Sequence, residues 1–351
     1  MKYKIEIWPI IKLIDLYNND NLNLNPPYQR NSIWSINAQK LLIDTIKSAL
    51  PLPVFFLQEK ENGKYEMVDG QQRTRAILGF EKGLFNDKED KYFEKNDFSN
   101  YDIPICVLSK TLTIEEVREF YVRVNKTGLK LERPELNKAE YYDTTFLKLV
   151  TELTNSDSFQ ELRLFRKSDI KRMFDRDFVE ELVSLLINGI TDKKKAVDRL
   201  FETDIDQIQY EEIIENFNNI LGKISLLNDL HPIAETRYSQ KNDFYTLFGL
   251  INDISNFSPK ELEYAYKVLI KIQDGIRPSN DDCEPLQEYA INCVTQSNSK
   301  KAREKRLNIL RSILLNESKV PNKIQKQVAK YYKLEEPILI ELNKYYTLRI
   351  I

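Results

Sequence analysis

The pattern of apolar and polar positions changes once along the chain, at about residue 135. Before that point, short runs rich in β-branched and aromatic residues predict strands over residues 54–58, 65–68 and 103–108. Apolar positions three and four residues apart predict helices between them, over residues 36–50, 71–82 and 113–125. After residue 135 almost every segment has helical spacing, which predicts about seven helices up to residue 318.

Turn and capping residues locate several element boundaries. Gly63 lies between two predicted strands in the sequence Glu-Asn-Gly-Lys, which is typical of a hairpin. Thr113 with Glu116, and Ser258 with Glu261, have the spacing of capping boxes that begin helices. We therefore expect an α+β protein, with a small mixed-sheet domain over residues 1–135, a larger all-α domain over residues 136–318 and a C-terminal helical tail over residues 319–351.

Composition excludes several classes of protein. The 351 residues include 52 Lys and Arg against 54 Asp and Glu, so the net charge of -2 predicts no attraction to nucleic acid without a local patch. The nine Gly residues form no dinucleotide-binding or P-loop motif. With His231 as its one histidine, the chain lacks the residues of an HNH nuclease, a two-histidine zinc site or an HD phosphohydrolase. Three scattered cysteines, a charged N-terminus and apolar runs far shorter than a membrane span predict a cytoplasmic protein.

The sequence Met-Val-Asp-Gly-Gln-Gln-Arg, residues 67–73, lies where a predicted buried strand gives way to a helix. A helix N-terminus attracts anions through its unpaired backbone N–H groups, and Gly70 lets a ligand approach the backbone closely. We expect Arg73 to bind phosphate oxygens, and Asp69 to hold a magnesium ion or orient a water molecule. The alternative is structural, because Asp69 and Gln72 have the spacing of a capping box.

A second string with polar chemistry precedes the first long helix. Residues 25–30 read Asn-Pro-Pro-Tyr-Gln-Arg, and the two prolines stiffen the segment. In such a segment Gln29 can contact a base or ribose, and Arg30 can contact phosphate. Trp34, just beyond, is interpreted as a core residue rather than a base-stacking platform.

A third string ends one predicted helix and begins the next. Arg123, Asn125 and Lys126 gather hydrogen-bond donors at a helix end, where they could offset the repulsion of a phosphate group. As an alternative, Asn125 and Gly128 only end the helix.

The densest basic run lies on a predicted helix over residues 300–311. It contains five cations within seven residues, namely Lys300, Lys301, Arg303, Lys305 and Arg306. One interpretation is a solvated helix face, and the other is a DNA-binding strip that contacts the phosphate backbone.

Taken in order, the three strings resemble the ParB/sulfiredoxin-type nucleotide-binding domain. The resemblance is to the branch found in GmrSD-type modification-dependent restriction enzymes and SspE-like phage-defence proteins. Residues 69–73 match the D-G-Q-Q-R signature of that branch, and the strings at residues 25–30 and 125–139 are similar to the first and third ParB boxes. Weaker similarities continue through the helical half, at Arg172, Met173, Asp177, Phe178, Thr236, Arg237, residues 242–245, Ala302, Arg303 and Arg306.

The resemblance implies a domain that binds a nucleoside triphosphate with Mg²⁺ and, in several members, hydrolyses it. Carried over by motif, the implied catalytic residues are Asp69, Gln72 and Arg73, with Asp69 as the metal ligand. The implied nucleotide-binding residues are Tyr28, Gln29, Arg30, Gly70, Gln71, Arg73, Arg123, Asn125 and Lys126. Gln71 and Gln72 stand where sulfiredoxins have a reactive cysteine, which excludes a thiol-based reductase. A single histidine leaves no HNH nuclease in the chain, so a separate nuclease or effector subunit is an expected partner.

Two hypotheses of function follow. The first is a sensor or regulatory protein of a bacterial defence system that binds a nucleoside triphosphate and hydrolyses it. The second is a module in which nucleotide or DNA controls conformation or assembly without hydrolysis.

Overall fold

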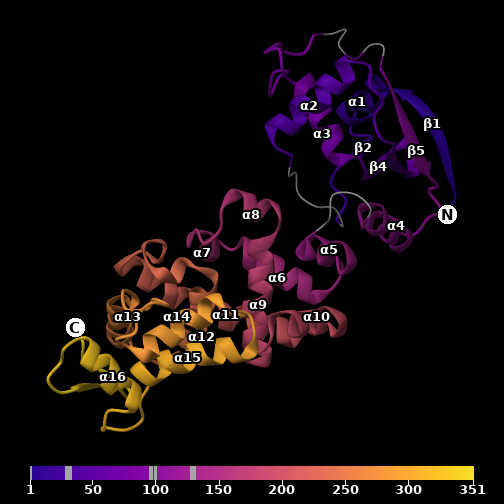
Figure 1. Ribbon diagram of the computed structural model, residues 1–351. Helices are drawn as coiled ribbons and strands as arrows, with labels where there is room; N and C mark the ends of the chain where they lie inside the picture. Colours follow the sequence, from indigo (N-terminus) through magenta and orange to yellow (C-terminus); the bar gives the residue numbers. More distant parts are fainter. Residues whose placement is uncertain (1, 28–33, 95–97, 99–100, 127–131) are drawn as a thin grey trace. The chain divides into compact units, whose positions relative to one another are not determined.

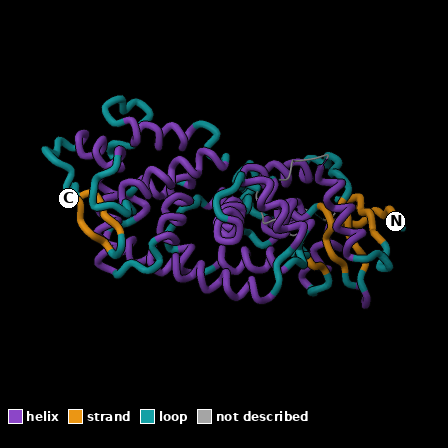
Figure 2. The backbone as a smooth tube through the Cα atoms, turned by 90° about the horizontal axis from the view of Figure 1, so that it is seen from below, coloured by secondary structure: helices purple, strands orange, loops and turns teal. Residues whose placement is uncertain are grey.

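The computed structural model describes residues 2–27, 34–94, 98, 101–126 and 132–351. Contacts between residues divide the chain into two compact units. The first consists of Met1–Tyr142 and Lys167–Met173, and the second of Asp143–Arg166 and Phe174–Ile351. In Figure 2 the strands lie in the first unit and beside the C-terminus, and helices form the rest of the second unit.

The first unit is built on a mixed five-stranded sheet. Its strands are β1 (Tyr3–Pro9), β2 (Leu22–Asn23), β3 (Phe55–Glu59), β4 (Tyr65–Asp69) and β5 (Asp102–Leu108), in the spatial order β1-β5-β3-β4-β2. The pairs β1–β5 and β3–β4 are antiparallel, whereas β3–β5 and β2–β4 are parallel. Because β3 and β4 are antiparallel, the first residues of β3 lie beside the last residues of β4, at one end of the strands.

Helices cover both faces of this sheet. Alternate strand residues, including Phe55, Leu57 and Met67, point into a core with α1 (Ile10–Asn18), α2 (Ile36–Lys47) and α3 (Gln71–Glu81). Figure 1 shows these three helices on the same side of the sheet. On the other face, Phe56 and Val68 pack in a smaller core against α4 (Ile114–Lys126) and α5 (Arg133–Glu140).

The second unit is helical apart from a hairpin near its end. Its longer helices are α6 (Thr145–Asn155), α9 (Phe174–Asn188), α10 (Lys193–Thr203), α11 (Gln207–Leu230), α12 (Lys241–Asp253), α13 (Pro259–Gln273), α14 (Glu284–Val294), α15 (Lys300–Leu314) and α16 (Lys323–Tyr331). Shorter turns are α7 (Asp157–Gln160), η2 (Ile233–Glu235) and η3 (Arg237–Ser239); α8 (Lys167–Lys171) belongs to the first unit, as does η1 (Glu61–Gly63). Every residue of α12 from Asp243 to Ile251 is buried, which makes it a central helix of the unit.

The α+β fold class is confirmed, and the predicted strands and helices up to residue 126 are present within a few residues of their expected ends. The capping boxes at Thr113 and Ser258 also form. The strands β1 and β2 and the helix α1 were not predicted. The expected C-terminal helical tail contains α16 but ends in a hairpin of β6 (Leu339–Leu342) and β7 (Tyr345–Leu348). No helix formed by the described residues is long and apolar enough to cross a membrane.

Candidate functional site

The corner between β4 and α3 depends on Gly70. This residue is the N-cap of α3 and has φ +107°, a conformation that L side chains rarely adopt. A Cβ atom built on it would lie 2.5 Å from Cδ1 of the buried Phe55 ring. The predicted capping box of Asp69 and Gln72 is wrong, because Gly70 occupies the N-cap position and the Asp69 carboxylate bonds elsewhere.

Arg73 turns back from the first turn of α3 towards the sheet. Its guanidinium donates to the carbonyl oxygen of Pro53, to that of Val54 at 3.1 Å and to Oδ2 of Asp69 at 3.1 Å. It also stacks on the Phe55 ring, 4.2 Å from the centroid. Burial lowers the pKa of Arg73, and its side chain is only 11% exposed. Arg73 therefore ties the start of β3, the end of β4 and α3 together.

The first turns of α3 hold both ends of the string predicted before the first long helix. Nε2 of Gln71 donates to the carbonyl oxygen of Leu24, and Arg75 donates to Oδ1 of Asn25. On the far side of the string, Oε1 of Gln72 accepts a bond from the Trp34 backbone N–H at 3.3 Å. The structure thus brings the first two strings together at the corner.

The central residues of the second string, Tyr28, Gln29 and Arg30, lie outside the described residues. Trp34 packs against the core beneath α1, α2 and α3, as expected for a core residue. The anchoring of Leu24, Asn25 and Trp34 on α3 was not anticipated from sequence. A signal for it exists, because Gln71, Gln72 and Arg75 lie within one and a half turns of each other on α3.

The third string approaches the same end of the strands, from the face of the sheet opposite α1, α2 and α3. The helix α4 begins beside the end of β3, where Gln58 donates to the Leu112 carbonyl at 3.0 Å. Further along α4, Phe120 meets Phe56 edge to face at 5.1 Å, and Phe56 pairs with Asp69 in the sheet. The helix α4 therefore runs towards the end of the sheet at which β4 ends and β3 begins.

Of the predicted residues on α4, only the Arg123 side chain is described. It is exposed and forms an ion pair of 2.6 Å with Glu119, one helical turn earlier. The side chains of Asn125 and Lys126 lie outside the described part of the chain. Their predicted contact with phosphate stays a prediction.

The corner offers limited ligands for a metal ion. The Asp69 side chain is 32% exposed and shares one oxygen with Arg73. Among the residues that the structure describes, no group of three or more His, Cys, Asp or Glu side chains could hold a metal ion. A magnesium ion here would need oxygen atoms from a bound ligand in addition to the carboxylate.

The predicted DNA-binding strip on α15 does not form as a single exposed surface. Arg306 is fully buried and donates to Oγ1 of Thr246 and to the carbonyl oxygens of Asn292 and Ser297. Arg303 is 2% exposed, pairs with Glu181 and stacks 4.1 Å from the Tyr245 ring centroid. These two arginines are therefore part of the interior, and the prediction is corrected for them.

The other three cations of that run are on the surface. Lys300 and Lys305 are near acidic residues of the same unit, Glu304 at 3.8 Å and Glu288 at 2.9 Å. Lys301 is exposed. Exposed pairs of this kind contribute little stability, so these lysines remain available to a ligand.

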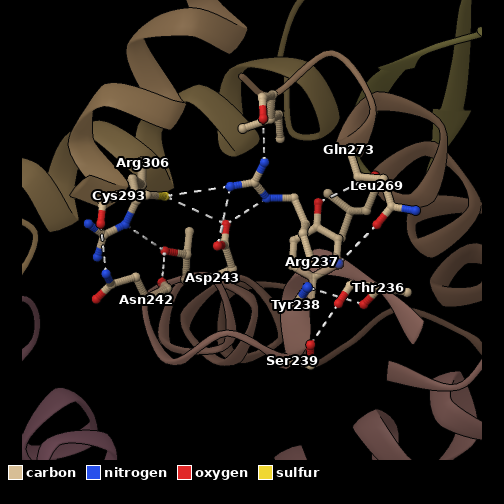
Figure 3. Close-up of polar contacts among 12 residues, drawn as sticks. Thr236, Arg237, Tyr238, Ser239, Asn242, Asp243, Leu269, Gln273, Cys293 and Arg306 are labelled. Atoms are coloured by element: carbon tan, nitrogen blue, oxygen red, sulfur yellow. Dashed lines mark hydrogen bonds and ion pairs between the residues drawn. The ribbon is translucent and has the colours of Figure 1, made fainter. Parts of the chain in front are cut away.

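Several of the weaker similarities in the helical half, namely Thr236, Arg237, Asn242, Asp243 and Arg306, meet in one polar network, shown in Figure 3. Arg237 forms two bonds with the carboxylate of Asp243, at 2.9 and 3.3 Å, and donates to the Ile276 carbonyl at 2.7 Å. Cys293 lies between this pair and the neighbouring Arg306 in Figure 3, and burial followed by the nearby Asp243 charge raises its pKa to about 12. A thiol in this state is not a nucleophile at neutral pH. The network holds η3, α12, α14 and α15 together, which gives these motif residues a structural role.

Comparisons with known proteins were informative for the first unit. A search of the curated proteins and a search of the solved structures each found no match. Residues 12–103 match the family model described as the GmrSD restriction endonuclease, N-terminal domain. The matched range contains the first two strings and every described contact between them. Over residues 12–103, the resemblance indicated by the first two strings is thus confirmed as a similarity to the N-terminal domain of the GmrSD restriction endonuclease family.

Proposed function

We propose that this protein is a regulatory component of a restriction-like defence system and that it binds a nucleoside triphosphate at the β4–α3 corner. The description of the matched family names a restriction endonuclease, which supports the defence role. The nucleotide role has its support in the geometry of the corner and in the motif at residues 69–73.

One observation carries the proposal. The segment with Gln29 and Arg30 is tied at both of its ends to the beginning of α3, through Gln71 to Leu24 and through Gln72 to Trp34. This arrangement joins a string of base-reading and phosphate-binding residue types to a helix N-terminus that attracts anions. Two anion-binding elements that are far apart in sequence would then act on one ligand.

The described contacts change the role that we assign to Arg73. Its bonds to Pro53, Val54 and Asp69 use both terminal nitrogens of the guanidinium. We therefore propose that Arg73 holds Asp69 and the corner in position. Phosphate contact then falls to Arg30, as predicted from sequence, and to the backbone at Gly70. Gln72, in the first turn of α3, stays a predicted catalytic residue.

The Asp69 carboxylate fits a magnesium site of the kind in which one carboxylate and the substrate phosphates share the ion. Bound there, Mg²⁺ would supply neutralisation of phosphate charge. In the absence of nucleotide, the 3.1 Å bond from Arg73 holds the Asp69 carboxylate in place. We propose hydrolysis as the reaction on these grounds, with Asp69 orienting either the ion or the attacking water.

A second candidate function is nucleotide binding without hydrolysis, in which the bound nucleotide controls assembly with a partner. The engagement of Arg73 favours it, because a guanidinium buried against Phe55 is not positioned to stabilise charge on a transferring phosphoryl group. DNA or a separate nuclease subunit is the partner that either function would serve.

Release of inorganic phosphate from ATP, GTP, CTP and UTP with Mg²⁺ separates these two candidates. The informative variant is Asp69→Asn, which keeps an acceptor for Arg73 but removes the charge. The matched control is Asp15→Asn, on an exposed position of α1. We expect release to fall by about 100-fold in Asp69→Asn and to be unchanged in the control. Equal release by both variants would remove Asp69 from the site, whereas binding without release in the wild type would establish the second candidate.

A further inference from the structure

The second unit has an open pocket of about 660 Å³ that the proposed function does not use. One wall is a face of α10, formed by residues three and four apart, with Lys195, Arg199 and Thr203 among them. The end of α9, the residues after α10 and the start of α15 complete it. Its volume lies in the range of about 300 to 1,000 Å³ that is typical of small-molecule sites.

Among the residues that line the pocket, cations outnumber acids. Its cations are Lys195, Arg199 and Lys300, and its acids are Asp192 and Asp204. Both acids are engaged with backbone N–H groups. Asp192 accepts a bond from the N–H of Lys300 at 2.8 Å, and the two oxygens of Asp204 accept bonds at the start of α6, at 2.8 and 2.9 Å.

The cations, by contrast, have few partners. Within the part of the chain that the structure describes, neither Lys195 nor Arg199 has an ion pair, and both are exposed. Lys300 has only a long contact of 3.8 Å to Glu304. A ligand with negative charge would therefore meet three cations, while Asp192 and Asp204 are directed at backbone N–H groups rather than paired with these cations.

The remaining lining selects the class of anion. Leu200 and Ile205 are apolar and buried, and Asn188 and Gln209 add amide groups. An apolar surface beside amides and cations suits a molecule with a ring system and phosphate groups better than a bare inorganic ion. The site is also held rigidly, because Lys193 at the start of α10 pairs with Asp177 at 2.6 Å and Glu181 at 2.5 Å of α9.

We propose that this pocket, centred on Lys195, Arg199 and Lys300, is a second ligand site that binds a phosphorylated small molecule of nucleotide size. It is independent of the β4–α3 corner, since every lining residue belongs to the second unit. A double-stranded DNA backbone fits less well, because the neighbouring Arg303 and Arg306 are buried and leave no continuous strip for successive phosphates.

Hydrogen–deuterium exchange of the full chain tests the proposal, because it reports both sites separately. The probes are ADP, inorganic phosphate and a single-stranded oligonucleotide, each added alone. We expect ADP to slow exchange in peptides from α10 and from the beginning of α15. Peptides over residues 69–81 report on the β4–α3 corner. If ADP does not slow exchange in these peptides, that result bears on the proposed function and not on the pocket.

The matched variants are a Lys195→Ala, Arg199→Ala double substitution and Lys260→Ala, an exposed lysine of α13 outside the pocket. Each charge-assisted contact is worth about tenfold in affinity, so the double variant should bind ADP about 100-fold more weakly at the pocket. The control should bind like the wild type.

Several results would overturn the proposal. They are the absence of slowed exchange at α10 with ADP in the wild type, equal protection in the double variant, and equal protection by phosphate alone. Protection by the oligonucleotide without protection by ADP would also overturn it and would indicate nucleic acid instead. The wild-type comparison decides the question even if the double variant is unstable.

Discussion

Replacing Gly70 with alanine places a methyl group against the ring that underlies the candidate site. Gly70 has φ +107°, and the added Cβ would lie 2.5 Å from Cδ1 of Phe55, which is fully buried. Backbone strain of this kind costs about 1 to 3 kcal/mol, and overpacking a core costs about the same. We expect the free energy of unfolding of the first unit to fall by about 3 kcal/mol.

Gly63→Ala is the matched control. Gly63 also has a positive φ, +72°, but no described atom outside Gly63 and its two chain neighbours lies within 4 Å of an added Cβ. It should therefore show the backbone part alone, about 1 kcal/mol. Urea unfolding followed by tryptophan fluorescence suits both variants, because the two tryptophans of the chain, Trp8 and Trp34, lie in the first unit.

A third variant isolates the steric contact. Phe55→Leu in the Gly70→Ala background shortens the side chain that the methyl group meets, so the double variant should lose less stability than the sum of the single changes. If Gly70→Ala costs no more than Gly63→Ala, or if the two sites are additive, then the described packing of Phe55 beneath the corner is refuted.

Three further predictions concern charged groups. Burial alone would raise the pKa of Asp87, but bonds from Lys47 and from two backbone N–H groups outweigh burial and lower this pKa. The stability that Asp87 contributes is therefore complete above about pH 4, and it is lost as the pH falls through the pKa of the folded state. Asp87→Asn should flatten this acid dependence of the free energy of unfolding. In thermal unfolding, Arg306→Met should destabilise the second unit by about 3 kcal/mol, because it leaves buried carbonyl groups without donors. Lys305→Met, which removes an exposed ion pair, should cost at most about 1 kcal/mol. A similar cost for both variants would contradict the burial of Arg306. If the protein binds DNA through α15, its affinity in fluorescence anisotropy at low salt should fall with Lys301→Ala, because Lys301 is exposed. Arg306 is buried and should make no direct contact with DNA.

Local features were predictable from the sequence because they depend on neighbours in the chain. The strands around Gly63 and the capping boxes at Thr113 and Ser258 are examples, since their signals lie within a few residues. The first strand was missed although Tyr3, Ile5 and Ile7 alternate with polar residues. These apolar residues are exposed at the sheet edge, so the alternation runs opposite to the usual pattern of burial.

Features set by distant partners were not predictable. Arg303 and Lys301 look alike in the sequence, but Arg303 is buried because Glu181 lies opposite it, 122 residues earlier. Arg73 likewise bonds to carbonyls about 20 residues before it rather than facing a ligand. The position of the motif between a strand and a helix was predicted correctly, whereas the direction in which Arg73 points depends on how β3 lies beside β4.

The central claim is that the β4–α3 corner binds a nucleoside triphosphate, and thermal unfolding of the first unit tests it most directly. Tryptophan fluorescence would be recorded with each of ATP, GTP, CTP and UTP in the presence of Mg²⁺. At 100 times its dissociation constant, the bound nucleotide should stabilise the unit by about 2.7 kcal/mol, and Asp69→Asn should lose most of this gain while Asp15→Asn keeps it. If no triphosphate stabilises the wild type at millimolar concentration, or if Asp69→Asn is stabilised as much as the wild type, the corner is not a nucleotide site.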